Sequence, residues 1–276
     1  MLSRYARGFM PSFPDARTGC VTWCRTSHRG VQFLDQIHIP KKQRQYVFSK
    51  RFEVRYNTAF EAVVRHCADP TRDAERTTWL STGLVEGLVA LHRRGFASSF
   101  EAWEGGELVG GGFGVLIGGF VSVDSMFHLT DDASKAAYVQ MLLGLRDRGF
   151  GVVDVNEPSP FMARWGAKWV PAWQFDALQR EAMGREVTFL DGRPAPRLPR
   201  ALRLTLAARR VRLALARRVG LETRWPQTKP AAAEAVLRPA STEAPLDPRV
   251  DLDVLLDPPA VARERAATSV SMTRAR

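Results

Sequence analysis

The sequence predicts a mixed fold of helices and strands, of the α+β or α/β class. Three observations support this prediction. Short segments alternate apolar and polar residues as strands do, longer segments carry apolar residues at helical spacing, and glycines separate the two kinds of segment. The expected order over residues 52–155 is a strand, two helices, a hairpin, a strand, a helix and a strand.

A strand and two helices come first. Residues 52–56 alternate as a strand does. Asn57 or Thr58 is expected to cap a helix that continues to Cys67, because a side-chain oxygen can accept the free amide hydrogens of the first turn. The second helix is expected over residues 80–94 and ends at a glycine, the residue that best tolerates the conformation of a helix end.

The remaining elements are expected over residues 97–103, 108–117, 120–127, 134–148 and 151–155. The first two are strands joined by Glu104-Gly-Gly-Glu107, a favourable hairpin turn. A strand, a helix closed by Gly149 and a last strand follow.

Length and composition exclude several classes of protein. A chain of 276 residues can bury a sizeable core in one large domain or two small ones. It has no run of about 20 apolar residues, so a membrane-spanning helix is not expected. The first residues lack the apolar stretch of a secretory signal, and three cysteines do not suit a disulfide framework, so we expect a cytoplasmic protein.

The positive charge is concentrated in one short segment. Residues 193–224 hold ten Lys or Arg and one acid, and so carry +9 of the net charge of +11. Composition predicts a small N-terminal domain over residues 1–50 and a main domain over residues 51–192. Residues 193–276 are expected to form a basic arm and a partly disordered tail, which has too little apolar surface to offset its ordering entropy.

Several motifs follow one another in a specific order between residues 98 and 156. They are Ser98-Ser-Phe-Glu-Ala-Trp103, Leu108-Val-Gly-Gly-Gly-Phe-Gly114, Asp124-Ser-Met-Phe127, Ala133-Ser-Lys135 and Val153-Asp-Val-Asn156. This order resembles that of the leucyl/phenylalanyl-tRNA–protein transferases, whose pattern runs E-x-W, L-V-G-G-x-Y-G-V, G-E-S-M-F, A-S-K and D-C-Q. Weaker matches, which include Tyr5-Ala-Arg-Gly-Phe9, Trp23 and Arg29, extend the resemblance from about Tyr5 to Phe175.

The resemblance implies an α+β fold with a core like that of the GNAT-type N-acetyltransferases, and an N-terminal domain that is incomplete relative to the family. It implies an aminoacyltransferase that moves leucine or phenylalanine from aminoacyl-tRNA to the N-terminal amine of an acceptor protein, a tag for degradation. Because the aminoacyl ester is already activated, neither a cofactor nor a metal is expected. We also expect a monomer without membrane association.

Two polar residues form the predicted catalytic pair. Asp154 and Asn156 lie two residues apart on the last expected strand, so their side chains share one face. An acid and a carboxamide together can hold an attacking amine, accept its proton and stabilise the oxyanion at an ester carbonyl. The resemblance assigns this role to the family's D-C-Q pair, in which the amide is one methylene longer. The alternative is a strand end whose polar groups bond to loop backbone.

The predicted substrate contacts also follow from the resemblance. Asp124 replaces the glutamate of G-E-S-M-F, as a substrate contact or, alternatively, as a cap or turn residue. The positions that form the family's pockets for the aminoacyl side chain and the terminal adenosine hold Trp79, Trp23, Met126, Phe127 and Phe113. Ordinary core packing is the alternative. Trp79 is the best candidate for stacking on a base.

RNA contacts are expected from Lys135, in the A-S-K match at the start of a helix, and from the basic arm. Arginine suits phosphate through its planar donor fork. The predicted contacts in the arm are Arg203, Arg209 and Arg210. A merely solvated run of charge is the alternative.

Three further patterns are less specific. The six glycines of residues 108–119 lack the Gly-Lys-Ser/Thr ending of a phosphate loop, so we interpret them as sites of close backbone approach or a bulge. Residues 146–151 match the acyl-CoA pyrophosphate pattern R-x-x-G-x-G, but they end a helix instead of starting one, which favours a helix C-cap. Cys20, Cys24 and His28 lack zinc-site spacing.

Two other functions stay open. One is a GNAT-type acyl-CoA N-acyltransferase, and the other is an inactive RNA- or peptide-binding protein. An assay separates the three functions: the first predicts transfer from aminoacyl-tRNA, the second transfer from acetyl-CoA, and the third binding without turnover.

Overall fold

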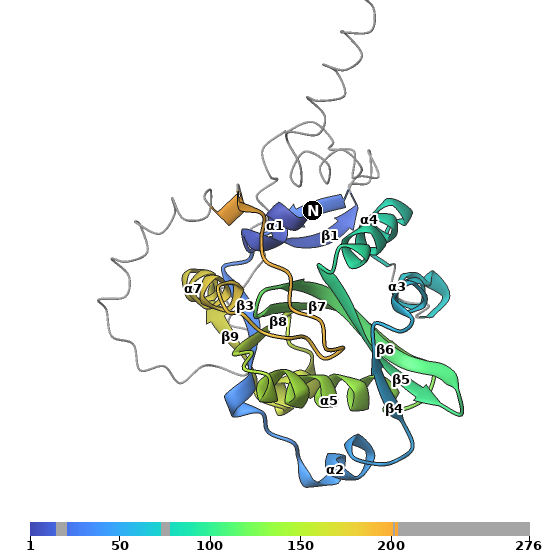
Figure 1. Ribbon diagram of the computed structural model, residues 1–276. Coiled ribbons are helices and arrows are strands. Elements are labelled where there is room, and N and C mark those ends of the chain that lie inside the picture. The colour runs from blue at the N-terminus through green and yellow to red at the C-terminus, as the bar shows by residue number, and fades with distance from the viewer. Residues whose placement is uncertain (15–20, 73–77, 201, 204–276) are drawn as a thin grey trace, which may run out of the picture.

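The computed structural model describes residues 1–14, 21–72, 78–200 and 202–203 (Figure 1). Its main element is a seven-stranded sheet in the order β4-β5-β6-β7-β8-β3-β9, and its mixture of helices and strands agrees with the expected α+β class. The strands of this sheet are β3 (His28–Phe33), β4 (Glu53–Tyr56), β5 (Ala97–Glu104), β6 (Glu107–Ile117), β7 (Phe120–His128), β8 (Val152–Asn156) and β9 (Ala167–Pro171). A smaller sheet pairs β1 (Met10–Pro14) with β2 (Val21–Cys24).

The described helices are α1 (Leu2–Ala6), α2 (Lys41–Val47), α3 (Phe60–Ala68), α4 (Thr82–Arg93), α5 (Ala133–Asp147), α6 (Pro160–Arg164) and α7 (Ala172–Met183), with short 3-10 turns at Leu34–Gln36 and Pro70–Arg72. Each element expected between residues 52 and 155 is present close to its expected bounds. Within the described residues, no helix combines the length and apolar character needed to cross a membrane.

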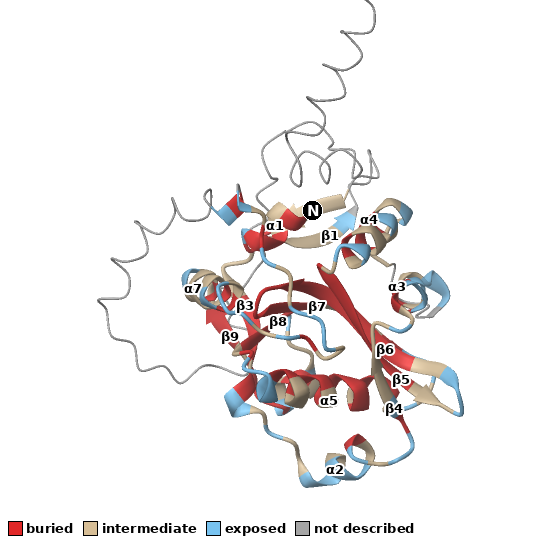
Figure 2. Cartoon of the chain, in the orientation of Figure 1, coloured by how far each residue is buried: buried red, intermediate tan, exposed pale blue. Residues whose placement is uncertain are grey.

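Both faces of the main sheet are buried, as the red central strands of Figure 2 show. Val115 and Ile117 of β6 belong to the core that includes α3 and α4, whereas Leu116 between them belongs to the core that includes α5. This alternation is the period of two expected of a strand. Helices therefore cover both faces of the sheet and leave the ends of the strands as the place for a site.

Glycines shape the central strands as the sequence predicts. Gly105 and Gly106 have φ angles of +60° and +90°, which suit the tight turn between β5 and β6. A Cβ on Gly114 would lie 1.6 Å from the carbonyl oxygen of Ser122, at the point where the register between β6 and β7 shifts. The glycine-rich stretch thus serves close backbone approach and a bulge, and not a phosphate loop.

The R-x-x-G-x-G match lies at the C-terminus of α5, which confirms the helix C-cap. Gly149 has a φ of +83°. Its amide donates to the carbonyl of Arg146 at 3.0 Å, and the amide of Phe150 donates to that of Leu145 at 3.1 Å. Because these amides already cap the helix, they do not form a cradle for a pyrophosphate.

The expected cap of α3 is wrong. This helix has no side-chain cap at its N-cap residue, Ala59; instead, Oε1 of Glu101 in β5 accepts the backbone amides of Thr58 at 3.0 Å and Ala59 at 2.9 Å, just before the first turn. Asn57 is occupied elsewhere, since its Oδ1 accepts the amide of Ser99 at 2.9 Å. A buried carboxylate is a stronger acceptor than a hydroxyl or an amide at a helix N-terminus.

Both ends of the described chain join the main core. β3, from the first 50 residues, lies between β8 and β9 and pairs antiparallel with each. At the other end, Leu198 and Leu202 are buried in the same core as α4. The domain limits at residues 50 and 192 stay predictions.

Candidate active site

A cleft opens where β7 and β8 separate. These strands are parallel, but only Val121 with Val153 and Ser122 with Asp154 are paired. Side chains from beyond these pairs line a cleft of about 840 Å³. Its lining includes Val123, Asp124, Ser125 and Met126 of β7, Val155 and Asn156 of β8, and Phe13, Trp79, Phe161 and Met162 from other segments. The carboxyl ends of parallel strands are a common place for ligand sites.

Asp154 lies behind the cleft and does not line it. Its side chain is 1% exposed, and Arg29 of β3 donates to both carboxylate oxygens, from Nε and Nη2, at 2.8 Å each. The backbone amide of Asn156 donates to the same Oδ1 at 2.9 Å. Burial opposes the charge on Arg29, but the attraction of Asp154 outweighs it and raises the pKa of the guanidinium. Asp154 is thus a paired anion that holds the strand end.

Asn156 lines the cleft and ends β8. Its φ of +56° is in the left-handed region, which asparagine tolerates better than most residues. Its Nδ2 donates to the carbonyl of Val123 at 3.1 Å and so connects the separating strands. Its Oδ1 is buried and has no hydrogen-bond partner within the described part of the chain. That oxygen is available to a donor on a bound substrate.

Asp124 lines the cleft from β7. Its Oδ2 accepts the hydroxyl of Tyr5 at 2.6 Å, and its Oδ1 accepts that of Ser122 at 2.7 Å. Burial raises the pKa of Asp124 to about 6, although the hydrogen bonds from Tyr5 and Ser122 oppose this shift. Burial also raises the pKa of Tyr5 well above its usual value, with a further contribution from Asp124, so the phenol keeps its proton and donates.

The structure separates the predicted aromatic contacts into two groups. Trp79 and Met126 line the cleft. Phe113 and Phe127 are buried in the core, where Phe127 stacks on His66 at 4.6 Å between ring centroids. Trp23 packs edge-on against Tyr5, with centroids 5.3 Å apart, and so lies behind Asp124. Asp124, Trp79, Met126 and Asn156 therefore share the cleft.

The predicted RNA contacts lie elsewhere. Lys135, at the start of α5, forms an ion pair with Asp132 at 2.8 Å and keeps 39% of its side chain exposed. Arg203 is exposed at the end of the described chain, and Arg209 and Arg210 lie outside the described residues. Of the cysteines weighed for zinc, Cys24 is a buried free thiol and Cys20 lies outside the described residues.

Five residues of this region had no predicted role: Tyr5, Phe13, Arg29, Ser122 and Phe161. Tyr5 and Arg29 belong to the motifs that carry the resemblance. Their partners, however, are 119 and 125 residues away, which no local pattern can indicate.

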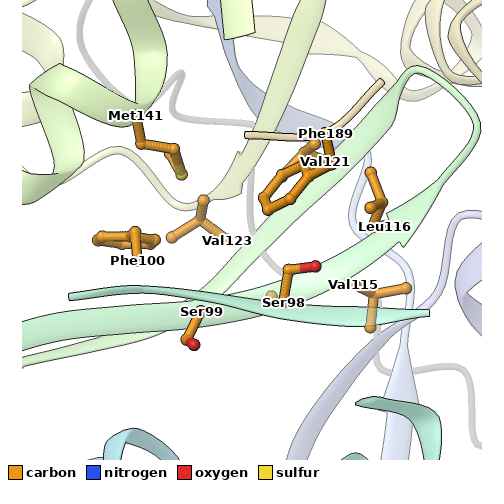
Figure 3. A pocket seen from close by; sticks show the side chains of 10 residues that line it. Ser98, Ser99, Phe100, Val115, Leu116, Val121, Val123, Met141 and Phe189 are labelled. Atoms are coloured by element: carbon orange, nitrogen blue, oxygen red, sulfur yellow. The ribbon is translucent and has the colours of Figure 1, made fainter. Parts of the chain in front are cut away.

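A smaller hollow lies between the main sheet and α5 (Figure 3). Its volume is about 10 Å³, and Phe100, Val121, Val123, Met141 and Phe189 surround much of it. Such a volume can hold at most about one water molecule. This hollow is too small for a substrate, whereas the cleft where β7 and β8 separate is large enough for one.

Comparison with known proteins gives one family. Residues 31–180 match the family described as leucyl/phenylalanyl-tRNA protein transferase. Proteins named leucyl/phenylalanyl-tRNA–protein transferase are similar in sequence. The one from Chlorobaculum parvum is 36% identical over 69% of this chain and 97% of its own, and the one from Chlorobaculum tepidum is 34% identical over the same shares. The one from Gluconobacter oxydans is 38% identical over 66% of this chain and 81% of its own.

Proposed function

Because the chain belongs to the leucyl/phenylalanyl-tRNA–protein transferase family, we propose that it moves leucine or phenylalanine from aminoacyl-tRNA to the N-terminal amine of an acceptor protein. One observation carries this proposal: the matched residues include both strands that separate to form the cleft. The added residue tags the acceptor for degradation.

The reaction depends on positioning. The amine nitrogen attacks the ester carbonyl carbon, the carbon–nitrogen bond forms, and the bond to the terminal ribose oxygen breaks. One proton passes from the amine to that ribose oxygen. Since the ester is already activated, the scheme uses neither metal nor cofactor. Holding the two reactants together supplies much of the rate enhancement.

Asn156 is our candidate for contact with the amine. Its free Oδ1 accepts an N–H of the amine as it enters the cleft, while its Nδ2 stays on the carbonyl of Val123. Asp154 supports this arrangement through the backbone amide of Asn156 and through Arg29. The sequence also predicts that Asp154 accepts the proton of the amine directly. Such a transfer would need a carboxylate oxygen of Asp154, and Arg29 already donates a hydrogen bond to each of them.

The apolar lining suits the two ends of aminoacyl-tRNA. Trp79 and Phe13, the latter 54% exposed, line the cleft and are our candidates for stacking on the terminal adenine. Met126, Phe161 and Met162 form an apolar lining that suits a leucyl or phenylalanyl side chain. Lys135 and the basic arm, with Arg203, Arg209 and Arg210, are our candidates for contact with the RNA backbone.

We assign the core to the GNAT type. Its support is the pair of parallel strands that separates at a ligand-sized cleft, with a helix as the crossover between them. An acyl-CoA donor is less favoured, because the amides of the R-x-x-G-x-G match cap α5. We place the reaction in the cytoplasm, where aminoacyl-tRNA is made and used, and expect a monomer, which size-exclusion chromatography with light scattering measures.

Transfer of a labelled amino acid tests the proposal. Purified protein is incubated with labelled Leu-tRNA or Phe-tRNA and a peptide that begins with Arg, and the peptide mass is measured. The expected product gains one Leu or Phe, while the same peptide with an acetylated N-terminus gains nothing. In parallel, aminoacyl-tRNA should raise the Tm and acetyl-CoA should not. Acetyl transfer, or binding without turnover, would reject the proposal.

A further inference from the structure

Two carboxylates lie near the point where β7 and β8 separate, and they are bonded differently. Both oxygens of Asp154 accept from the Arg29 guanidinium, and the side chain is 1% exposed. Each oxygen of Asp124 accepts one neutral hydroxyl, from Tyr5 or Ser122, and the residue lines the cleft. A carboxylate oxygen has two acceptor sites, so Asp124 keeps capacity for a substrate.

Asp124 and Asn156 lie just beyond the last paired residues of β7 and β8. Ser122 is paired with Asp154, Asp124 and Asn156 each follow two residues later, and both line the cleft. The ladder ends before them, and Asn156 Nδ2 bonds to the carbonyl next to Asp124. An amine that donates one N–H to Asn156 Oδ1 thus has the Asp124 carboxylate as its neighbouring acceptor.

We propose that Asp124, and not Asp154, takes the proton from the attacking amine. This role rests on the proposed function and adds a catalytic residue to it. As the carbon–nitrogen bond forms, the proton moves from the amine nitrogen to an Asp124 oxygen. As the ester carbon–oxygen bond breaks, Asp124 returns that proton to the ribose oxygen. The products are an amide and a free hydroxyl, and Asp124 is regenerated.

The charges around Asp124 agree with this role. Tyr5 faces it from α1, Arg29 from β3 and Asp154 from β8, and the cleft lining also carries Cys67, Asp69 and Glu157. Burial raises the pKa of Asp124 to about 6. A base of this strength is mostly ionised at neutral pH and accepts a proton more readily than an ordinary aspartate, whose pKa is about 3.9.

The pH dependence of kcat tests the proposal. Transfer from Leu-tRNA to an Arg-initiated peptide is measured between about pH 5 and 9, with both substrates saturating. The parent should lose activity below a pKa near 6, separate from the substrate amine near about 8. Asp124→Asn should lower kcat about 100-fold or more and remove the lower of these two pKa values from the profile.

Three variants separate this role from a structural one. Asp124→Glu keeps a carboxylate and should keep the lower pKa. Tyr5→Phe removes a hydrogen bond that lowers the pKa of Asp124, so the lower pKa should move upward. Asp147→Asn, at the exposed end of α5, is a charge-matched control and should leave the profile unchanged.

Three results would contradict the role of Asp124, and they differ in what they reject. A folded Asp124→Asn protein, checked by circular dichroism, that keeps both kcat and the lower pKa would overturn the proposal. So would loss of the lower pKa in Asp154→Asn but not in Asp124→Asn, which would assign the proton to Asp154. A parent protein that transfers from neither Leu-tRNA nor Phe-tRNA would overturn the proposed function, and this role with it.

Discussion

Arg29 and Asp154 face each other on neighbouring strands, with guanidinium Nε and Nη2 each 2.8 Å from one carboxylate oxygen. Their side chains are 4% and 1% exposed. A buried ion pair offsets its desolvation only with such two-point geometry. The pair joins β3, from the beginning of the chain, to the strand that ends in Asn156, and so links the stability of the fold to the shape of the cleft.

Removal of one partner of this ion pair should therefore lower the stability of the protein. Arg29→Met leaves the Asp154 charge buried and unpaired, and the free energy of unfolding should fall by about 3–5 kcal/mol. Urea unfolding followed by circular dichroism measures it. Arg65→Met is the control, because its ion pair with Glu61 is exposed and should contribute less than about 1 kcal/mol. Equal losses in the two variants would contradict this account.

Removal of the free amide oxygen in the cleft should affect turnover more than affinity. We expect Asn156→Ala to lower kcat about 10-fold or more, with nearly unchanged affinity for aminoacyl-tRNA, because the contact matters chiefly in the transition state. Asn156→Gln restores the longer amide of the related motif and should raise transfer if the amide is too short. Single-turnover transfer and filter binding measure the two quantities. A kcat indifferent to both changes would exclude Asn156 from the chemistry.

Two of the cleft aromatics, Trp79 and Phe13, should contribute to binding of the aminoacyl-tRNA donor. If Trp79 and Phe13 stack on the terminal base, each change to alanine should cost about 1–3 kcal/mol of affinity and leave kcat at saturation almost intact. Fluorescence titration with aminoacyl-tRNA gives the Kd. Trp173→Ala provides a control on α7, where the indole is 42% exposed. Unchanged Kd for Trp79→Ala and Phe13→Ala would place the base elsewhere.

Asp124 should reduce stability at neutral pH. Its pKa of about 6 in the folded protein exceeds the value of about 3.9 of an unfolded chain. The folded state then binds the proton more tightly, so the stability from this group is complete below about pH 4 and is lost as pH rises through 6. The free energy of unfolding of Asp124→Asn should be about 1–2 kcal/mol higher than that of the parent at pH 8, and this difference should vanish near pH 4. Urea unfolding at both pH values measures it, and a constant difference would contradict the shift.

The basic arm should contribute to RNA affinity through its charge. Truncation is best placed after Arg203, since Leu198 and Leu202 are buried in the core. Removal of residues 204–276 should weaken tRNA binding and reduce its salt dependence, because fewer phosphate contacts release fewer counterions. Binding measured at several salt concentrations gives the slope. An unchanged affinity and slope would mean that the arm does not contact RNA.

Local pattern was sufficient for the elements between residues 52 and 155. Period-two alternation and the Gly105-Gly106 pair indicate the hairpin of β5 and β6, and the glycine at 149 marks the end of α5. Motif order indicated the family, and with it four residues that line the cleft: Asp124, Trp79, Met126 and Asn156. The contact of Glu101 with the segment before α3 was missed, because Glu101 is 43 residues from Thr58.

The elements, the family and the polar side chains at the strand ends could all be predicted from local pattern, because these depend on neighbours along the chain. The difference between the two acids could not be predicted in this way, because it arises from contacts between distant parts of the chain. Asp124 and Asp154 are both strand aspartates, yet one meets the Tyr5 hydroxyl and the other the Arg29 guanidinium. Burial and partner set what a carboxylate can do. Both the burial and the partner depend on which strands pair over long range. The alternation of apolar and polar residues along a strand does not predict that pairing.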